Sequence, residues 1–570
     1  MYLYNIGRST ISHRWFHPFL LLMWFIIGIS LRFHNLTAKP PWIDEFATLV
    51  FSLGNSFSSV PLDQVITPEI LLQPLEINPS ATIKDVSQII ITQDTHPPLY
   101  FVLAHLWMKL FPHPENLVSL WAGRSLPALF GAVSITCAYV LGKLAFRSRL
   151  VGQISAAMMA VSPYGIFIAQ EARHYSLAII WVMASLMCLL IATRHLQNQT
   201  ILPVWLMIIW VVINALGIAT HYFFVLSLGA EGLVLIFIAV KQYTQSKKIS
   251  FLSPLWWRIY AIAAGTAVAG LVWLPSFIDN RYRSSLTEWI QGTRTGLDWI
   301  SPIFQALATW ITMISLLPVE ATKLPFVILS GFVMLVFFIW GIPILVRGIN
   351  NQLQSQPNRL MIQVLSGVVL GAIAFFFFFT YVLGIDLTRG ARYSFVYFPA
   401  VIIVVAASLA VCYENPDIGK WGITGKKAVM LFWLMGLISA ISVTYNLGYR
   451  KYYRPDLLVP LITENSSQPV LISTTHRNLV QTGEMMGIAW ELKFSGSQID
   501  TKFLLAHQEQ DPNTSTISLD NTLKEFPRPF DLWLVNFHAP TGEEVKKCDL
   551  ELEDMPAIMG YGYQLYHCHK

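Results

Sequence analysis

The stretch PFLLLMWFIIGISLRFHNLTAKPPWIDEF, residues 18–46, combines a long apolar run with two adjacent acidic residues. Its first part, 18–33, is an apolar run that follows two arginines and has no small-residue cleavage site behind it, so we expect an uncleaved membrane anchor. Its last part places Asp44 and Glu45 side by side near the predicted lipid–water boundary. Carboxylates so close to hydrocarbon are costly and tend to be kept for a function, although a solvated loop explains an isolated pair equally well.

The composition of the 570 residues indicates a polytopic membrane protein. Hydrophobic residues make up 54% and charged residues only 12%, whereas a soluble protein carries roughly a quarter charged residues. The 19 Trp, 35 Phe and 21 Tyr are typical of aromatic belts at two membrane interfaces. The net charge of +5 therefore reflects orientation in the membrane, and we predict no nucleic-acid partner.

The cysteines do not form a metal-binding pattern. CxxC, HExxH, Walker-type and strand-linked GxGxxG motifs are missing from the sequence, so we predict neither a metal site nor a cofactor. Cys137, Cys188 and Cys412 fall in apolar runs and are expected to be packing residues. Cys548 and Cys568 lie in a polar segment, where a bridge would close a loop of about 20 residues worth roughly 3 kcal/mol. Two free thiols are the alternative.

Apolar runs long enough to cross a membrane predict about eleven helical spans. After the anchor they lie at 125–146, 151–169, 175–193, 202–219, 222–240, 259–278, 325–346, 361–383, 394–412 and 428–447. Shorter runs at 97–111 and 302–317 are expected to be juxtamembrane helices. The basic clusters between spans place the N-terminus in the cytoplasm by the positive-inside rule. The loops 34–124, 170–174, 220–222, 279–324 and 384–393 then face outward.

The sequence predicts two domains, a membrane domain over 1–447, which includes the loop 34–124, and a soluble extracytoplasmic domain over 448–570. Strand-like runs at 469–473 and 530–535 surround a helix-like stretch at 476–492, which favours a small α/β fold. This second domain carries no catalytic motif. We therefore expect it to bind or position an acceptor.

Charged and aromatic residues gather in the loops predicted to face outward. Polar loops are common, but carboxylates, arginines and histidines over one membrane face favour a site for an anionic, lipid-borne substrate. Moving a sugar from a polyprenyl phosphate to a hydroxyl would need a carboxylate to accept the proton and cations to stabilise the departing phosphate. The residues gathered in these loops include Asp44, Asp94, His96, Glu171, Arg173, His174, His221, Arg281, Asp386, Arg392 and Tyr393.

A series of motifs resembles the GT-C membrane glycosyltransferases, in particular the group with the protein O-mannosyltransferases and the lipid A aminoarabinose transferase. The motifs are Trp42-Ile-Asp-Glu45, Asp94-Thr-His-Pro-Pro-Leu-Tyr100, Arg124-Ser-Leu-Pro-Ala-Leu-Phe-Gly131, Ser162-Pro-Tyr164, Gln170-Glu-Ala-Arg-His-Tyr175 and Gly390-Ala-Arg-Tyr393. They span about residues 1–412. The resemblance implies a multi-pass glycosyltransferase of the cell envelope. Its expected partners are a polyprenyl-phosphate-linked sugar donor, a protein, lipid or polysaccharide acceptor, and membrane lipids.

The resemblance also implies roles for single residues. Asp44 matches the acid taken as the base of an inverting, direct displacement. His96 stands where relatives carry a lysine that contacts the lipid phosphate, so this contact would depend on protonation of His96, or on Arg281 or Arg392. Glu171 matches an acid that positions the acceptor or supports the base. We predict Asp44, Glu45 and Glu171 as catalytic residues, and Asp94, His96, Arg173, Tyr175, His221, Arg281, Arg392 and Tyr393 as substrate-binding residues.

Other interpretations stay open at this point. Glu45 could cap a juxtamembrane helix, and Glu171 and Arg173 could form a local ion pair. Arg124 could anchor a span end by snorkelling. A transporter or flippase for lipid-linked sugars would show charges in mid-span and broken helices in paired halves. A structural scaffold would explain the C-terminal domain but not the acidic loop.

Overall fold

The protein divides into two compact units, each assembled from separate stretches of the chain. The computed structural model describes residues 2–112, 116–246, 253–280, 287–292, 294–415, 423–497, 499–511, 513–552 and 555–569, with only the backbone of 2–14, 245–246, 277 and 279–280. The first unit combines Met1–Leu36, Thr95–Tyr100 and Arg124–Tyr449. The second combines Thr37–Asp94, Phe101–Gly123 and Arg450–Lys570. Most of the loop 34–124, which we grouped with the membrane domain, therefore shares a unit with the C-terminal segment.

The first unit is a bundle of long helices. They are α1 (Tyr2–Phe33), α6 (Leu120–Phe146), α7 (Arg149–Val161), α8 (Pro163–Ala169), α9 (Tyr175–Gln197), α10 (Val204–Thr220), α11 (Phe224–Ser246), α12 (Pro254–Leu271), α13 (Leu274–Asn280), α14 (Ser301–Thr312), α15 (Leu324–Gln354), α16 (Gln356–Tyr381), α17 (Phe398–Glu414) and α18 (Gly425–Thr444). The 3-10 helices η5 (Gly296–Trp299), η6 (Leu387–Arg389) and η7 (Ala391–Val396) lie between them.

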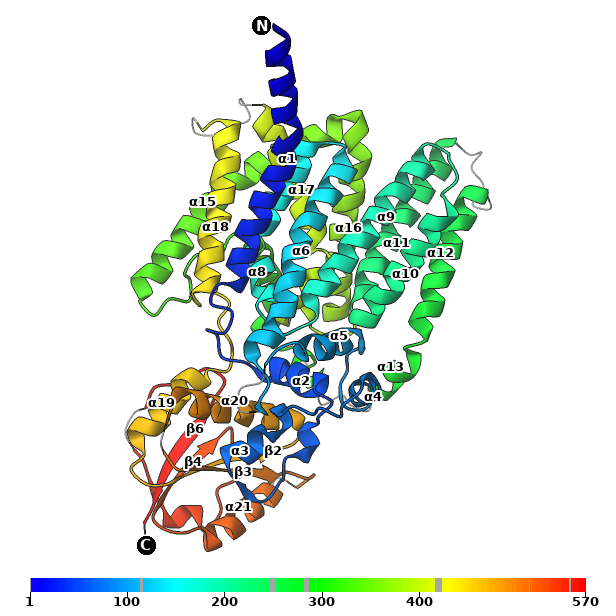
Figure 1. The fold of residues 1–570 in the computed structure, drawn as a ribbon. Helices are drawn as coiled ribbons and strands as arrows, with labels where there is room; N and C mark the ends of the chain where they lie inside the picture. Colours follow the sequence, from blue (N-terminus) through cyan, green and yellow to red (C-terminus); the bar gives the residue numbers. More distant parts are fainter. Residues whose placement is uncertain are drawn as a thin grey trace. The chain divides into compact units, whose positions relative to one another are not determined.

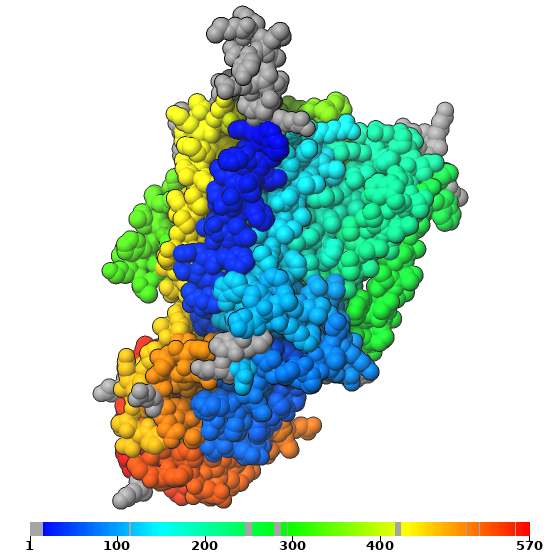
Figure 2. All heavy atoms as spheres, in the orientation of Figure 1, coloured from blue at the N-terminus to red at the C-terminus, as the bar shows by residue number. Residues whose placement is uncertain are grey.

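The length and composition of these helices are those of a multi-pass membrane protein. Among the described residues, seven helices are long and apolar enough to span a membrane, or eight if α7 and α8 form one bent span. The shorter apolar helices α10 and α17 coincide with two further predicted spans. The polytopic helical fold is confirmed, although fewer helices meet the length of a span than the eleven expected. Figure 1 shows α1 beside α18 and α6, and Figure 2 shows these blue, yellow and cyan segments packed together.

The predicted span at 151–169 is broken because Ser162 and Pro163 interrupt it. The axes of α7 and α8 differ by 57° at this point. Pro163 has no N–H to offer the carbonyl of Met159 one turn earlier. The guanidinium of Arg32, which is fully buried, donates to this carbonyl at 3.0 Å and to that of Ala160 at 3.1 Å. A buried arginine thus satisfies the backbone groups that the proline leaves open.

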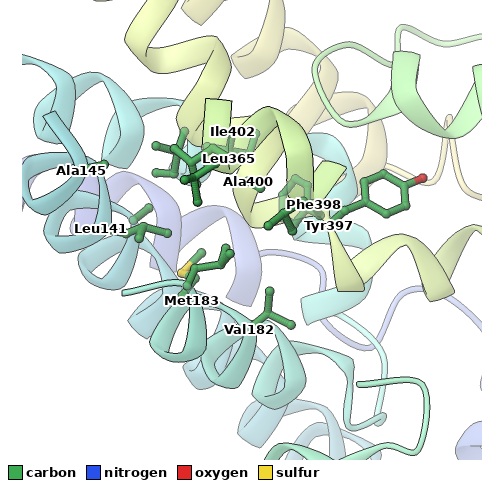
Figure 3. Close-up of a cluster of buried hydrophobic side chains, with 14 of the residues drawn as sticks. Leu141, Ala145, Val182, Met183, Leu365, Tyr397, Phe398, Ala400 and Ile402 are labelled. Carbon is green, nitrogen blue, oxygen red and sulfur yellow. The ribbon is translucent and has the colours of Figure 1, made fainter. Parts of the chain in front are cut away.

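The core of the bundle surrounds α17, which is buried along most of its length. Small residues such as Ala406 let neighbouring helices approach it closely. Leu141 of α6, Met183 of α9, Leu365 of α16 and Ile402 of α17 belong to one apolar cluster (Figure 3). The packing of η7 against α9, α11 and α17 brings the loops before these helices together at one end of the bundle.

The second unit is an α/β fold. Its elements are α2 (Ile43–Ser52), η1 (Phe57–Ser59), β1 (Val65–Ile66), α3 (Pro68–Leu72), η2 (Gln73–Leu75), α4 (Ile83–Gln93), α5 (Leu99–Met108), α19 (Pro455–Asn465), β2 (Val470–His476), α20 (Leu479–Ser495), β3 (Thr501–His507), α21 (Asn513–Glu525), β4 (Phe530–Val535), η9 (Val545–Lys547), β5 (Asp549–Leu550) and β6 (Tyr563–Cys568). α5 begins with two residues that cluster with the first unit. The strand order is β1-β3-β2-β4-β6-β5, with β3, β2 and β4 mutually parallel.

The sequence correctly predicts much of this sheet but misses its edge. The predicted strands at 469–473 and 530–535 correspond to β2 and β4, and the predicted helix to α20. The missed strand β1 comes from the first loop and pairs antiparallel with β3, with Val65 opposite Leu504. The disulfide between Cys548 and Cys568 is present, and it ties the end of β6 to the segment before β5.

Candidate active site

Three histidines and two arginines gather at one end of the helix bundle. His96 lies in the first unit, Arg173 and His174 connect α8 to α9, His221 follows α10, and Arg392 lies in η7. The ring centroids of the three histidines are 4.6–5.6 Å apart. We call these five residues the His/Arg cluster. His174 and His221 are buried, so the cluster is largely withdrawn from water.

Aromatic side chains hold the arginines of the His/Arg cluster. The Arg392 guanidinium lies 5.2 Å from the ring centroid of Trp289 and 5.4 Å from that of Tyr393. The Arg173 guanidinium lies 5.9 Å from the ring of Tyr175. Cation–π contacts of this kind orient a guanidinium.

Hydrogen bonds fix which nitrogens of two histidines carry protons. Arg173 Nη2 lies 3.3 Å from His96 Nε2, and because a guanidinium only donates, the proton of neutral His96 sits on Nδ1. The backbone N–H of Phe223 donates to His221 Nδ1 at 3.0 Å, which puts the proton of neutral His221 on Nε2. Burial lowers the pKa of His174 and of His221 well below the ordinary histidine value, and nearby histidines and arginines lower it further.

This arrangement suits an anion better than a metal ion. The histidines of the cluster do offer nitrogen atoms that lie within 4.8 Å of one another, a spacing that a metal ion can use. However, N–H donors already occupy a ring lone pair on His96 and on His221. The charges of Arg173 and Arg392 would also repel a cation. Their guanidinium N–H groups and the imidazole N–H groups are instead donors for an anionic group.

The structure brings together several of the residues predicted to bind substrate. His96, Arg173, Tyr175, His221, Arg392 and Tyr393 are all in or beside the His/Arg cluster. His174 received no role from the sequence, because nothing in the sequence shows that it meets the other two histidines. Glu171 is buried close by in the chain, with 3% of its surface exposed. Arg281 lies outside the described residues.

The acidic stretch belongs to the second unit, where α2 carries it. Asp44 and Glu45 occupy the first turn of α2, where the helix dipole favours ionised carboxylates. Glu45 is fully buried, and its Oε2 lies 3.3 Å from the Nζ of Lys451, which in turn lies 5.2 Å from the ring of Trp42. Asp44 is only half-buried. Glu45 is therefore engaged in the fold, and Asp44 is the more accessible carboxylate.

Asp94 and Arg124 lie at positions where they take part in the fold. Asp94 ends α4 and is half-buried in the second unit. Arg124 is fully buried and donates to the carbonyl of Leu36 at 3.0 Å, so it does not snorkel.

A separate cavity of about 780 Å³ lies between α9, α11, α15 and α16 and includes Gln197 and Lys241. These residues end helices that begin at the His/Arg cluster, so this cavity lies at the opposite end of the bundle.

Comparisons with known proteins yield likenesses in structure alone. No family model and no curated protein matches the chain. Among solved structures it matches ArnT from Cupriavidus metallidurans bound to undecaprenyl phosphate, with 10% identity, a TM-score of 0.47, and coverage of 90% of this chain and 92% of that one. AglB from Archaeoglobus fulgidus, in complex with an inhibitory peptide and a dolichol-phosphate, gives 11% identity, a TM-score of 0.42 and coverages of 84% and 64%.

The chain also matches the S. cerevisiae protein O-mannosyltransferase Pmt1–Pmt2 complex bound to the sugar donor, at 14% identity and a TM-score of 0.34. It covers 51% of this chain and 36% of that one. The chain is similar to GT-C glycosyltransferases. These TM-scores are below 0.5, so the likeness is one of general fold and assigns no role to any residue of this chain.

Proposed function

We propose that this protein is an integral-membrane glycosyltransferase that moves a sugar from a polyprenyl-phosphate donor to an acceptor hydroxyl on the extracytoplasmic face. The observation that carries the proposal is the His/Arg cluster, in which two guanidinium groups and neutral imidazoles present N–H donors at a largely buried site. A monophosphate leaving group needs such donors where its negative charge develops. The helices α9, α11 and α17 also begin near the cluster, and their N-termini favour an anion.

Asp44 is the proposed base. It lies in the first turn of α2, half-buried, while its neighbour Glu45 is held by Lys451. An ionised carboxylate there accepts the proton of the acceptor hydroxyl as that oxygen attacks the anomeric carbon. The bond from this carbon to the phosphate oxygen breaks as the new glycosidic bond forms, which inverts the anomeric centre. Glu45 and Glu171 support the base in this proposal. The positive-inside rule places the N-terminus in the cytoplasm.

A transporter of lipid-linked sugars is the second candidate, because one carboxylate does lie inside a helix of the bundle. Glu231 of α11 is 2% exposed, and its Oε2 accepts a hydrogen bond from Ser185 at 2.8 Å. Ser185 also accepts from Trp210 and contacts Asn214. Ionisable residues within a membrane span mark ion or substrate pathways in transporters.

Reconstitution of the full chain in vesicles with a radiolabelled polyprenyl-phosphate sugar separates the two candidates. Cleavage of the donor supports the transferase, and movement across the bilayer without cleavage supports the transporter. Arg173→Gln and Arg392→Gln should each weaken donor binding about 10-fold to 100-fold, as expected for the loss of a charge-assisted hydrogen bond. Arg258→Gln is the control, because this arginine donates to Leu202 at the opposite end of the bundle. Equal behaviour of all three variants would contradict the role of the His/Arg cluster.

A further inference from the structure

The sheet of the second unit has a topological switch point. From β2 the chain passes through α20 to β3 on one side, and it then returns through α21 to β4 on the other side of β2. The three strands are parallel, so the connections after β2 and β4 diverge at the carboxyl ends of these strands. In open α/β sheets, ligands bind in the crevice at such a point.

A cavity of about 500 Å³ lies at this switch point, within the size range of small-ligand sites. Gln481 and Glu484 line it from α20, which follows β2, and Asn536 and His538 line it from the loop after β4. Three tyrosines, Tyr452, Tyr453 and Tyr561, also line it, together with Ile558, Met559, Gly560 and Gly562. We call this cavity the tyrosine pocket. Its position is the one that the strand order predicts.

The polar side of the tyrosine pocket is already held in place by hydrogen bonds. Glu484 is buried; its Oε1 accepts from the Tyr453 hydroxyl at 2.8 Å, and its Oε2 accepts from Asn536 Nδ2 at 3.1 Å. Asn536 Oδ1 accepts from the backbone N–H of Gly562 at 2.8 Å. Burial raises the pKa of Glu484, which favours its neutral form. A ligand would therefore meet a preorganised set of donors and acceptors.

The loop that carries Tyr561 requires glycine at position 560. Gly560 has φ of +86°, and a Cβ there would lie 2.7 Å from the carbonyl oxygen of Tyr452. Only glycine accepts both this conformation and this approach at little cost. The ring of Tyr453 lies 5.6 Å from that of Tyr561 and 5.2 Å from that of Tyr452. The aromatic wall of the pocket is thus fixed by the backbone as well as by side chains.

The chemistry of the lining selects a polyhydroxylated ligand. Neither lysine nor arginine is among the described residues that line the pocket, so it has no fixed positive charge for a phosphate. Ile558 and Met559 belong to the lining, but the pocket exposes more polar than apolar surface, which disfavours an acyl chain. Tyrosine faces pack against the C–H faces of sugars, while amide, imidazole and carboxyl groups exchange hydrogen bonds with hydroxyls. Tyr452 is 62% exposed and is available for such stacking.

The helix that carries the proposed base packs on α20, which also lines the tyrosine pocket. Both α2 and α20 belong to the second unit, and a Cβ at Gly483 of α20 would lie 3.0 Å from the side chain of Ile43. Burial raises the pKa of the Tyr453 hydroxyl, Glu484 and Tyr452 raise it further, and the charge of Asp44 adds the smallest contribution. The proposed base and the pocket thus lie in one unit, on two helices that pack against each other.

We propose that the tyrosine pocket binds a carbohydrate group of the acceptor and thereby brings an acceptor hydroxyl to Asp44. This inference rests on the proposed glycosyltransferase function, because it names the chemical class of the acceptor at that site. It assigns the C-terminal segment a specific task, the recognition of a glycan.

Saturation-transfer NMR on the detergent-solubilised full chain tests the proposal without any donor. The probes are the methyl glycosides of glucose, galactose, mannose, N-acetylglucosamine and arabinose, with N-acetyl-lysine methyl ester as a cationic comparison. At least one glycoside should bind. Tyr452→Ala should weaken that binding about threefold to tenfold, the scale of an aromatic contact. His538→Ala should weaken it as well.

The control is Phe494→Ala, which removes a 56% exposed aromatic residue of α20 that does not line the pocket. It should bind the glycoside as the wild type does. Absence of glycoside binding, binding of the lysine ester instead, or equal effects of all three variants would each overturn the proposal. Asp44→Asn should keep glycoside binding. Donor cleavage is scored separately, so a wild type that binds glycosides without ever cleaving a donor would reject the proposed function and not the pocket.

Discussion

The ion pair between Glu45 and Lys451 should decide whether α2 keeps its place in the second unit. The two side chains are 0% and 5% exposed, and their charged atoms lie 3.3 Å apart. Lys451→Met removes the positive charge and leaves a buried carboxylate, which costs about 3–5 kcal/mol. In a unit of this size each kcal/mol lowers Tm by about 2–4 °C, so we expect a loss of roughly 10 °C. Temperature-dependent proteolysis of the full chain, read by mass spectrometry of peptides from 450–570, measures this loss.

Two further variants make the test specific. The double variant Glu45→Gln with Lys451→Met removes both charges and should recover most of the lost stability, because no uncompensated charge then stays buried. Lys502→Met breaks the ion pair between Lys502 and Asp500, whose side chains are 34% and 64% exposed, respectively. This loss should lower the free energy of unfolding by less than about 1 kcal/mol. If Lys451→Met unfolds at the same temperature as Lys502→Met, the reasoning about this buried pair is refuted.

Four other predictions concern chemistry and conditions. Asp44→Asn should keep donor binding but lower transfer by orders of magnitude, as measured by single-turnover transfer of the labelled sugar; near-normal transfer would remove Asp44 as base. Full activity after EDTA treatment is expected, and a loss that added metal restores would contradict the anion site. Burial lowers the pKa of His476 from 6.5 to about 4, so the unfolded state binds the extra proton. Stability of the second unit should therefore fall by about 3 kcal/mol between pH 6.5 and pH 4, and His476→Gln should flatten that pH dependence in the proteolysis assay. Thiol labelling of unreduced, denatured protein should modify three cysteines and leave Cys548 and Cys568 unlabelled; modification of all five would exclude the disulfide.

Hydropathy and loop charges were sufficient to predict the helical membrane fold, because a span is a local property of about 20 residues. They failed where distant parts of the chain cooperate. Arg32 lies at the end of an apolar run and looks like an interfacial arginine, yet it is buried because the proline break between α7 and α8 leaves carbonyls to satisfy. Likewise β1 has two residues and no strand pattern of its own, so only its pairing with β3 makes it a strand.

For the candidate site, too, the sequence predicted which residues are involved but not the details that depend on distant parts of the chain. The motifs identified His96, Arg173 and Arg392, and the outward-facing loop 220–222 added His221; the described structure brings these residues together. The sequence could not show which nitrogens carry protons, since that depends on the backbone N–H of Phe223 and on the guanidinium of Arg173. Protonation of His96, which we expected to serve phosphate contact, would conflict with the hydrogen bond it accepts. The sequence did not reveal the tyrosine pocket, because its members are spread over four separate segments between residues 452 and 562.

The second unit is built from three separate stretches of chain, so its early segments must wait for late ones during synthesis. The helix with the proposed base packs on α20, and β1 pairs with β3, so residues near position 50 depend on partners near positions 490 and 505. Contacts of such long sequence separation form late and slowly, because their loop-closure entropy must be overcome first. During synthesis, the acidic stretch would therefore emerge long before its partners exist. A nascent chain should complete the surroundings of the proposed base only after α20 and β3 have been translated.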